Sequence, residues 1–245
     1  MVHKTVDPAF IKSEAKRVFD SVKNGGLAIL ALDIAYSIGG SAREAIERSL
    51  VVKKRAGGKK CGGLGNIEMS KELHILDDRT REFISAIAVD LDLPFTIVAP
   101  VRMDHPYMQA MDPWVRDIST KNGTFSMLLN GGPLLNELAP MCLAELVPIV
   151  GSSANISLQG SNFSLESIEP EIRAAADVET DLGLGKYYNP QGISSTIISL
   201  PDLDVIRFGA FYEKIADVAK KDFGLEMPAR PTDYVHKEQL EPAAA

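Results

Sequence analysis

Apolar residues along the chain follow two patterns that predict its elements. In residues 8–23 they recur at helical spacing, and Asn24-Gly25-Gly26 would end that helix. In residues 27–31 they form a short continuous run, as in a buried strand. The same patterns predict helices over 41–52, 71–91, 133–146, 165–176 and 211–223, a short helix within 104–117, and strands over 95–101, 125–129, 147–150, 193–200 and 205–208. Strands and helices are mixed without a regular repeat, so we predict an α/β fold: a single domain with one twisted mixed β-sheet and flanking helices.

Some segments carry more specific expectations. Ser41 is expected to cap the helix 41–52, and Glu44 would complete a capping box. Residues 73–76 would also fit a short strand before the helix that ends at residue 91. Residues 53–66 are expected to form a glycine-rich basic loop. The domain would span residues 1–224, and the proline-containing residues 225–245 would form a loosely held tail.

Composition narrows the class of protein. With 245 residues and 45% hydrophobic content, the chain is long enough for one large domain. No apolar run approaches the ~20 residues of a membrane span, and the polar first ten residues lack the apolar core of a signal peptide. Cys61 and Cys142 are too few for a disulfide scaffold or a metal cluster, and no spacing resembles a zinc site. We therefore expect a cytoplasmic protein with no membrane partner and no protein-held metal.

The formal net charge of −7 argues against tight, sequence-independent binding of RNA or DNA, because such binders are usually basic. The positive charge is local instead, in a run that surrounds Gly57 and Gly58. Guanidinium and ammonium groups beside flexible glycines are typical of phosphate binding, although a solvated basic loop is the alternative. The segment lacks the strand, GxxxxGK[ST] and helix order of a P-loop. Its cations are Lys53, Lys54, Arg55, Lys59 and Lys60.

A second polar cluster follows the predicted strand 147–150. Ser153 and Asn155 belong to the segment Gly151 to Ser157, which is rich in serine and ends a buried-looking strand. Open α/β sheets bind ligands at the carboxyl ends of their strands, so these groups could hold a ribose, a triphosphate or a carboxylate. A polar turn is the alternative. Ser195, Thr196 and Arg207 lie beside two later strands, where a strand-start polar cluster and an exposed arginine are the alternatives.

Taken in order, these pieces resemble the YrdC-like family of threonylcarbamoyl-AMP synthases, which act in tRNA modification. The resemblance extends from about residue 12 to residue 212. The segments that carry it are Ala31-Leu32-Asp33-Ile34-Ala35-Tyr36-Ser37-Ile38, Lys53-Lys54-Arg55-Ala56-Gly57-Gly58-Lys59-Lys60, Ser153-Ala154-Asn155, Ser195-Thr196 and Arg207-Phe208-Gly209.

The resemblance implies ATP-dependent joining of bicarbonate and L-threonine into threonylcarbamoyl-AMP, with release of pyrophosphate. Mg²⁺ would accompany ATP, and other tRNA-modification proteins would be partners, whereas direct RNA binding is doubtful. Lys53 and Arg55 would be catalytic. The implied ATP-binding residues are Lys53, Arg55, Lys59, Ser153, Asn155, Ser195, Thr196 and Arg207, and the implied amino-acid pocket contains Leu32, Ile34 and Tyr36.

The departures from the family pattern keep other functions open. Leu32 and Ile34 replace two threonines of the implied amino-acid pocket, and Ala56 and Lys60 replace two prolines of the basic loop. The segment 127–130 lacks the arginine of the family. One alternative is the same adenylating chemistry on another amino acid or carbamate, and a second is a non-catalytic nucleotide- or RNA-binding paralogue. The sequence leaves the amino acid, the activity of this divergent site, the oligomeric state and the role of the tail undecided.

Overall fold

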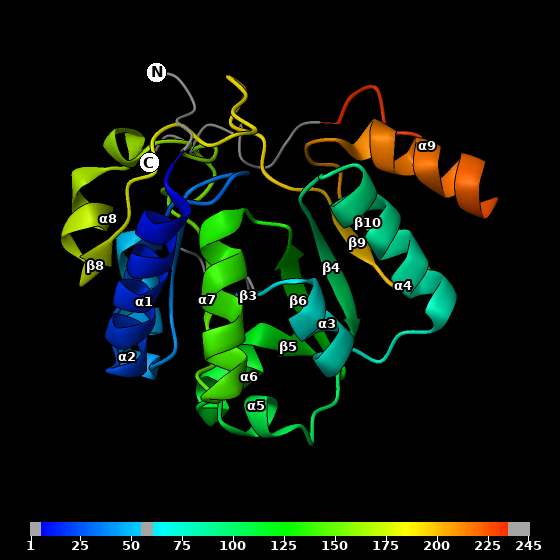
Figure 1. Ribbon diagram of the computed structural model, residues 1–245. Coiled ribbons are helices and arrows are strands. Elements are labelled where there is room, and N and C mark those ends of the chain that lie inside the picture. The colour runs from blue at the N-terminus through cyan, green and yellow to red at the C-terminus, as the bar shows by residue number, and fades with distance from the viewer. Residues whose placement is uncertain (1–5, 55–60, 235–245) are drawn as a thin grey trace.

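The computed structural model describes residues 6–54 and 61–234 of the chain, and Figure 1 shows their arrangement. Its strands are β1 (Ala28–Leu30), β2 (Ser37–Gly40), β3 (Gly62–Leu64), β4 (Phe95–Pro100), β5 (Thr120–Lys121), β6 (Thr124–Leu129), β7 (Val150–Ser153), β8 (Val178–Glu179), β9 (Ile197–Ser199) and β10 (Asp204–Arg207). Its helices are α1 (Pro8–Lys23), α2 (Arg43–Val52), α3 (Ile67–Leu73), α4 (Asp78–Ser85), α5 (Pro106–Gln109), α6 (Pro113–Ser119), α7 (Pro133–Ala144), α8 (Pro170–Ala174) and α9 (Tyr212–Phe223), with a π-helix η1 (Ala86–Asp90) and a 3₁₀-helix η2 (Leu165–Ser167).

All the described strands belong to one 10-stranded sheet. The strand order is β10-β9-β4-β6-β3-β7-β2-β1-β8, and β5 pairs with β6. The pairs β1–β8, β3–β6 and β4–β9 are parallel and the other pairs are antiparallel. The predicted α/β class with one mixed sheet is therefore confirmed.

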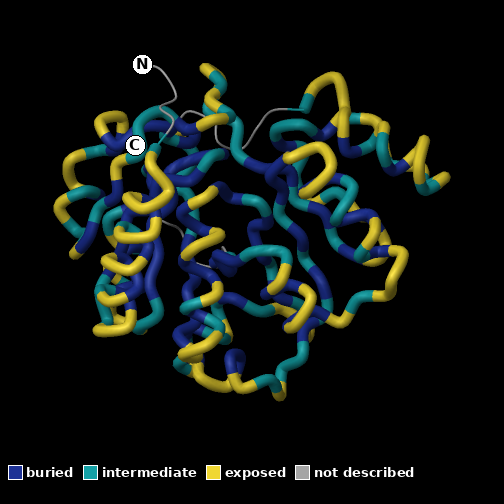
Figure 2. The backbone as a smooth tube through the Cα atoms, in the orientation of Figure 1, coloured by how far each residue is buried: buried dark blue, intermediate teal, exposed yellow. Residues whose placement is uncertain are grey.

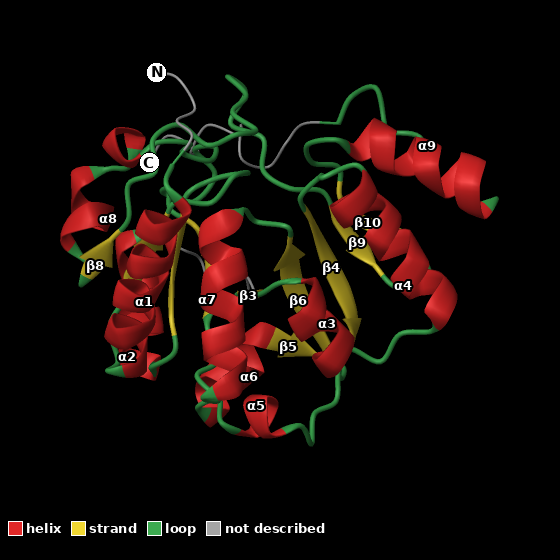
Figure 3. Cartoon of the chain, viewed as in Figure 1, coloured by secondary structure: helices red, strands yellow, loops and turns green. Residues whose placement is uncertain are grey.

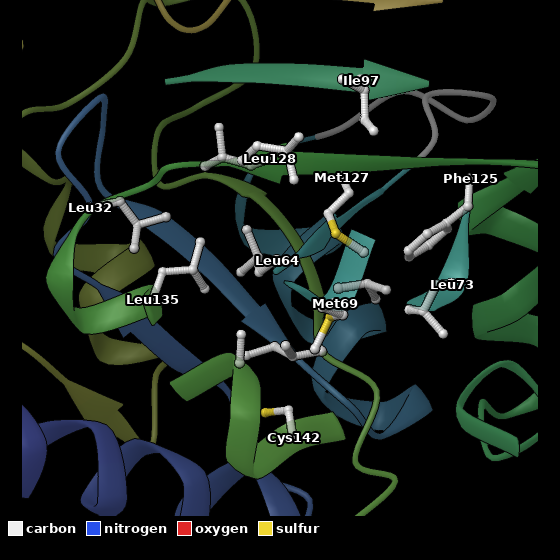
Figure 4. Close-up of a cluster of buried hydrophobic side chains, with 14 of the residues drawn as sticks. Leu32, Leu64, Met69, Leu73, Ile97, Phe125, Met127, Leu128, Leu135 and Cys142 are labelled. Carbon is white, nitrogen blue, oxygen red and sulfur yellow. The ribbon is translucent and has the colours of Figure 1, made fainter. Parts of the chain in front are cut away.

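The helices α1, α3 and α7 lie over one face of the sheet, with α1 and α7 side by side (Figure 1). Figure 2 shows that buried residues follow the strands and the inner sides of these helices. In the close-up of Figure 4, Met69 of α3 lies between Met127 of the sheet and Cys142 of α7. All three side chains are almost completely buried, and burial raises the pKa of the Cys142 thiol to about 12. The predicted amphipathic helices thus bury their apolar faces against the sheet.

Four strands escape prediction because they are short and carry little hydrophobic pattern. β2, β3, β5 and β8 contain the sequences Ser-Ile-Gly-Gly, Gly-Gly-Leu, Thr-Lys and Val-Glu. Glycine is required in this part of the sheet by close backbone approach: a Cβ on Gly151 of β7 would lie 2.4 Å from the carbonyl oxygen of Ile38. The glycine-rich loop predicted over residues 53–66 therefore contains a central strand, β3, in its last part.

Proline accounts for other differences from the predicted elements. The strand predicted over residues 147–150 begins only at Val150 and continues to Ser153, because Pro148 has no N–H for a ladder hydrogen bond. The helix predicted over 165–176 is divided, since Pro170 can begin a helix but cannot continue one. In contrast, α7 continues through Pro140, which is on the exposed side of the helix.

Two helix boundaries also differ. The helix predicted over residues 71–91 is interrupted after α3, where His74 is extended and pairs with Val101, so the short-strand alternative is partly correct. Asp77 then caps α4 by accepting a hydrogen bond from the N–H of Thr80 at 2.8 Å. The predicted cap at Ser41 is wrong, because α2 begins after Ala42 and has no side-chain cap hydrogen bond.

Part of the predicted tail packs against the domain. Leu225 and Met227 contact the hydrophobic core, and the ring of Tyr234 lies 5.0 Å from that of Phe208. The Arg230 guanidinium donates a hydrogen bond of 3.0 Å to the backbone carbonyl oxygen of Gly209. Residues 225–234 therefore make several contacts with the domain, although none of them is buried, and residues 235–245 of the predicted tail lie outside the described part. Within that part, no helix has the length and apolar character needed to cross a bilayer.

Candidate functional site

A cavity of about 430 Å³ lies against the central strands, on the side of the sheet away from the core described above. Along β6, Phe125 and Met127 are buried in the core, whereas Ser126 between them lines the cavity. Thr96 of β4 also lines the cavity, while its neighbour Ile97 faces the core (Figure 4). The side-chain alternation of the strands therefore supplies the hydroxyl groups of this cavity.

The floor of the cavity is made largely of backbone, because Gly62, Gly63 and Gly151 line it. Gly62 leaves space there, since a Cβ on it would lie 3.0 Å from Oγ of Ser126, which also lines the cavity. Long loops gather above these strands at the upper end of the view in Figure 3. The hollow is thus a consequence of small residues on adjacent central strands.

Lys53 joins the two polar segments that the sequence predicts to share a site. It directly follows α2 and is only 2% exposed. Its ammonium group donates a hydrogen bond of 2.7 Å to the carbonyl of Asn155 and another to the carbonyl of Ser153. The N–H of Ser157 donates to the carbonyl of Lys53 at 3.0 Å. Lys53 lines the cavity and, at the same time, fixes the loop that follows β7.

Asn155 presents a buried acceptor at the same place. Its Nδ2 donates to the carbonyl of Ile156 at 2.7 Å, and its Oδ1 has no hydrogen-bond partner among the described residues. The residue is 4% exposed and lines the cavity. A buried polar atom without a partner costs about 1–3 kcal/mol, so a donor on a ligand or a water molecule would be stabilised there. Ser153, at the end of β7, lines the cavity beside it.

The opposite wall contains Ser195 and Arg207. The Arg207 guanidinium donates to the carbonyl of Ser195 through Nε at 2.9 Å and through Nη2 at 2.7 Å. Nη2 also lies 3.3 Å from Ser195 Oγ, which in turn is 2.8 Å from Oγ1 of Thr96. These contacts hold the cation at the cavity wall, where all three residues line the space.

Thr196 is placed differently from the expectation. Its side chain is completely buried and does not line the cavity. Its hydroxyl donates to the carbonyl of Ala210 at 2.8 Å and accepts from the N–H of Gly209 at 3.2 Å. Thr196 therefore holds the segment after Arg207, and its hydroxyl is turned to that segment and not to the cavity.

The implied amino-acid pocket is divided between two cavities. Ile34 lines the cavity that contains Lys53, whereas Leu32 and Tyr36 line a separate cavity of about 380 Å³. Leu32 is 1% exposed and lies in the core near Leu135 (Figure 4). The Tyr36 hydroxyl donates to the carbonyl of Gly183 at 2.8 Å, and burial raises the pKa of this hydroxyl. In this structure Leu32 and Tyr36 therefore line one cavity and Ile34 lines another, and an amino-acid pocket shared by the three residues stays a prediction.

Three cations of the predicted basic loop, Arg55, Lys59 and Lys60, lie outside the described residues. Among the described residues that line the cavity, Lys53 and Arg207 carry positive charge and none carries a carboxylate. The described part of the chain also contains no cluster of three or more His, Cys, Asp or Glu side chains suited to a metal ion. The charge of the described lining is therefore suited to an anion.

Several lining residues could not be assigned to the site from the sequence, and three of them are polar or aromatic side chains. Thr96 and Ser126 each lie between buried apolar residues of their strands, and this alternation could have shown that they face away from the core. Tyr234 reaches the cavity from the segment that follows α9. No local pattern marks that residue, because its position depends on the packing of Tyr234 against Phe208.

Comparison with known proteins gives one related sequence and several related folds. No family model matches the chain. A protein of Methanocaldococcus jannaschii, provisionally named threonylcarbamoyl-AMP synthase, is 26% identical over 204 residues, which cover 80% of this chain and 86% of that protein.

Among solved structures, a hypothetical protein from Streptococcus mutans has a TM-score of 0.64 at 19% identity, covering 82% of this chain and 88% of its own. Sua5 of P. abyssi in complex with L-threonine has a TM-score of 0.62 at 19% identity, covering 87% of this chain and 59% of Sua5. YciO of E. coli has a TM-score of 0.59 at 15% identity, covering 84% of this chain and 92% of YciO. The sequence relative and the shared fold confirm the predicted resemblance to the YrdC-like family.

Proposed function

We propose that the protein uses ATP to convert bicarbonate and an amino acid, with L-threonine as the first candidate, into a carbamoylated amino-acid adenylate for tRNA modification. The observation that carries this proposal is the cavity in which Lys53 and Arg207 face serine hydroxyls and a buried amide, without a carboxylate in the described lining. The names of the archaeal relative and of the threonine-bound Sua5 structure support the same reaction class.

The proposed chemistry has two bond-forming steps. The amine of the amino acid attacks the carbon of bicarbonate, and loss of water leaves a carbamate. A carbamate oxygen then attacks the α-phosphorus of ATP, and pyrophosphate leaves. Negative charge grows on the phosphate oxygens in the second step, so preorganised donors at those oxygens would lower its barrier.

Three residues of the cavity can be given roles that agree with their contacts. Arg207, held by two bonds to the Ser195 carbonyl, would neutralise phosphate charge without having to reorganise. Lys53 would set the position of Ser153 and Asn155 through their carbonyls while it adds positive charge to the cavity. The Asn155 Oδ1 would accept a hydrogen bond from a substrate N–H or O–H.

Mg²⁺ enters this proposal with its substrate. The cavity lining offers no carboxylate in the described residues, so the ion would be carried by the triphosphate and water and not by the protein. Ile34 favours a second candidate function, the same chemistry on a more apolar amino acid, because an aliphatic group here lines the cavity. A hydrophobic wall discriminates only weakly against an added hydroxyl, by about 10² at most, so threonine remains the first candidate.

The test is release of pyrophosphate by the purified protein with ATP, Mg²⁺, bicarbonate and each amino acid in turn. Release with threonine supports the proposal, and release with a more apolar amino acid supports the second candidate. Arg207→Ala should lower kcat/KM by at least about tenfold, because hydrogen bonds from a charged group contribute about 1.5–3 kcal/mol each. Arg43→Ala removes an exposed arginine paired with Glu47 and should leave the rate unchanged. ATP binding without release of pyrophosphate in the presence of any amino acid would contradict the proposal.

A further inference from the structure

The hydrogen bonds at the Arg207 wall have a direction that can be deduced from the chemistry of their atoms. A guanidinium group can only donate, so Ser195 Oγ accepts from Arg207 at 3.3 Å. Ser195 is 3% exposed, and its own hydroxyl hydrogen needs an acceptor. Within the described part of the chain, the hydroxyl acceptor in reach is Thr96 Oγ1, at 2.8 Å. Either hydroxyl of this pair could donate to the other, and donation from Ser195 to Thr96 is the arrangement that gives the Ser195 hydrogen an acceptor within the described residues. The chain of donation would then extend from Arg207 through Ser195 to Thr96.

If Thr96 accepts from Ser195, its own hydroxyl hydrogen is free to be donated to another group. Thr96 is partly exposed and lines the cavity, so its hydrogen can be donated into that space. The backbone of Thr96 is fixed, since its N–H donates to the carbonyl of Thr196 at 2.8 Å and β4 pairs with both β6 and β9. A donor at the end of a chain that begins at a cation is polarised by the bonds before it and prefers an anionic acceptor.

We propose that Thr96 is a substrate-binding residue, which donates a hydrogen bond to an anionic oxygen of the ligand as the last member of an Arg207–Ser195–Thr96 relay. This inference rests on the proposed function for the identity of the ligand. The anionic oxygen belongs to a phosphate of ATP or to the carboxylate of the amino acid, and both share the chemistry that the relay recognises. The two ends of the relay then contact one anion together, with Arg207 supplying charge and Thr96 supplying direction.

The test compares Thr96→Val, which keeps the shape and removes the hydroxyl, with Thr96→Ser, which keeps the hydroxyl. Calorimetric titrations with inorganic triphosphate and with threonine form the two arms. Thr96→Val should weaken binding about tenfold or more in one arm, and that arm identifies the anion. Thr96→Ser should stay within about threefold of the wild type. Thr124→Val is the matched control, since its hydroxyl donates to the carbonyl of Lys121 at 2.6 Å and does not line the cavity.

A double-mutant cycle separates the relay from a merely structural role. Ser195→Ala should weaken the same arm, and Thr96→Val should add little to its effect, because both changes interrupt one chain of donors. Additive losses, or unchanged affinity of Thr96→Val in both arms, would overturn the inference. If Thr96→Val does not fold, the comparison of Ser195→Ala with Ser195→Thr gives the same answer through the middle of the relay.

Together with the pyrophosphate assay, these titrations can distinguish a failure of the relay from a failure of the proposed function. Anion binding that depends on Thr96, in a protein that releases no pyrophosphate with any amino acid, would contradict the proposed function and support the relay. Pyrophosphate release with an unchanged KM for ATP and for the amino acid in Thr96→Val would contradict the relay alone.

Discussion

Lys53 is expected to contribute both to the stability of the fold and to ligand binding at the candidate site. Its ammonium group, 2% exposed, donates to the carbonyls of Ser153 and Asn155. Lys53→Met keeps most of the side-chain volume and removes both donors. Two carbonyls then lose a charge-assisted partner, and the loop after β7 is no longer joined to the end of α2.

The size of the effect follows from those two bonds. A hydrogen bond to a charged group contributes about 1.5–3 kcal/mol, so the pair contributes about 3–6 kcal/mol before the cost of burying the ammonium group is subtracted. We expect a net loss of about 2–4 kcal/mol in the free energy of unfolding. The matched control is Lys54→Met, because Lys54 is exposed and its ion pair with Glu171 at 3.3 Å should contribute less than about 1 kcal/mol.

Urea denaturation measures both variants, and titration with ATP measures the site. Lys53→Met should lose stability and also bind ATP at least about tenfold more weakly, because the turn that carries Ser153 and Asn155 is displaced. Lys54→Met should keep both properties. Unchanged stability in Lys53→Met would refute the structural role described here, even if ATP binding were lost.

Three further outcomes are expected from other residues. Burial lowers the pKa of His74 to about 4, below its ordinary value near 6.5. As the pH falls from 6.5 to 4, the unfolded chain therefore binds a proton that the folded chain does not, and the free energy of unfolding should fall by up to about 1.4 kcal/mol per pH unit. His74→Gln should flatten this pH dependence in denaturation curves. Gly151→Ala should lower the melting temperature or prevent folding, because its Cβ would meet the Ile38 carbonyl at 2.4 Å, and an unchanged melting temperature would show that the strands can separate. Tyr234→Ala should weaken ATP binding with little change in stability, since Tyr234 lines the cavity at the edge of the fold, and equal ATP affinity would remove it from the site.

Elements with a strong hydrophobic periodicity could be predicted from the sequence, whereas their ends depended on single residues such as prolines and capping side chains. Residues 8–23 form the predicted helix with the same bounds, because their apolar face and the following glycines both agree with it. Strands β2 and β3 could not be recognised, since their glycines give no hydrophobic pattern and are explained only by close backbone approach in the folded sheet.

The candidate site shows the same division. The order of its polar segments in the sequence correctly brought Lys53 next to Ser153 and Asn155. It did not show that Thr196 turns its hydroxyl to the backbone, because that contact forms with a segment fourteen positions later. Nor did it show that Leu32 packs in the core, since alternate residues of one segment face different cavities only after folding.

The most direct test of the proposed reaction follows the carbon of bicarbonate into the product. Purified protein is incubated with ATP, Mg²⁺, threonine and ¹³C-bicarbonate, and the adenylate fraction is analysed by mass spectrometry. The proposed reaction predicts a threonine-containing adenylate that carries the labelled carbon, is formed in equal amount to pyrophosphate and is lost in Arg207→Ala. Pyrophosphate release without labelled carbon in any adenylate would contradict it.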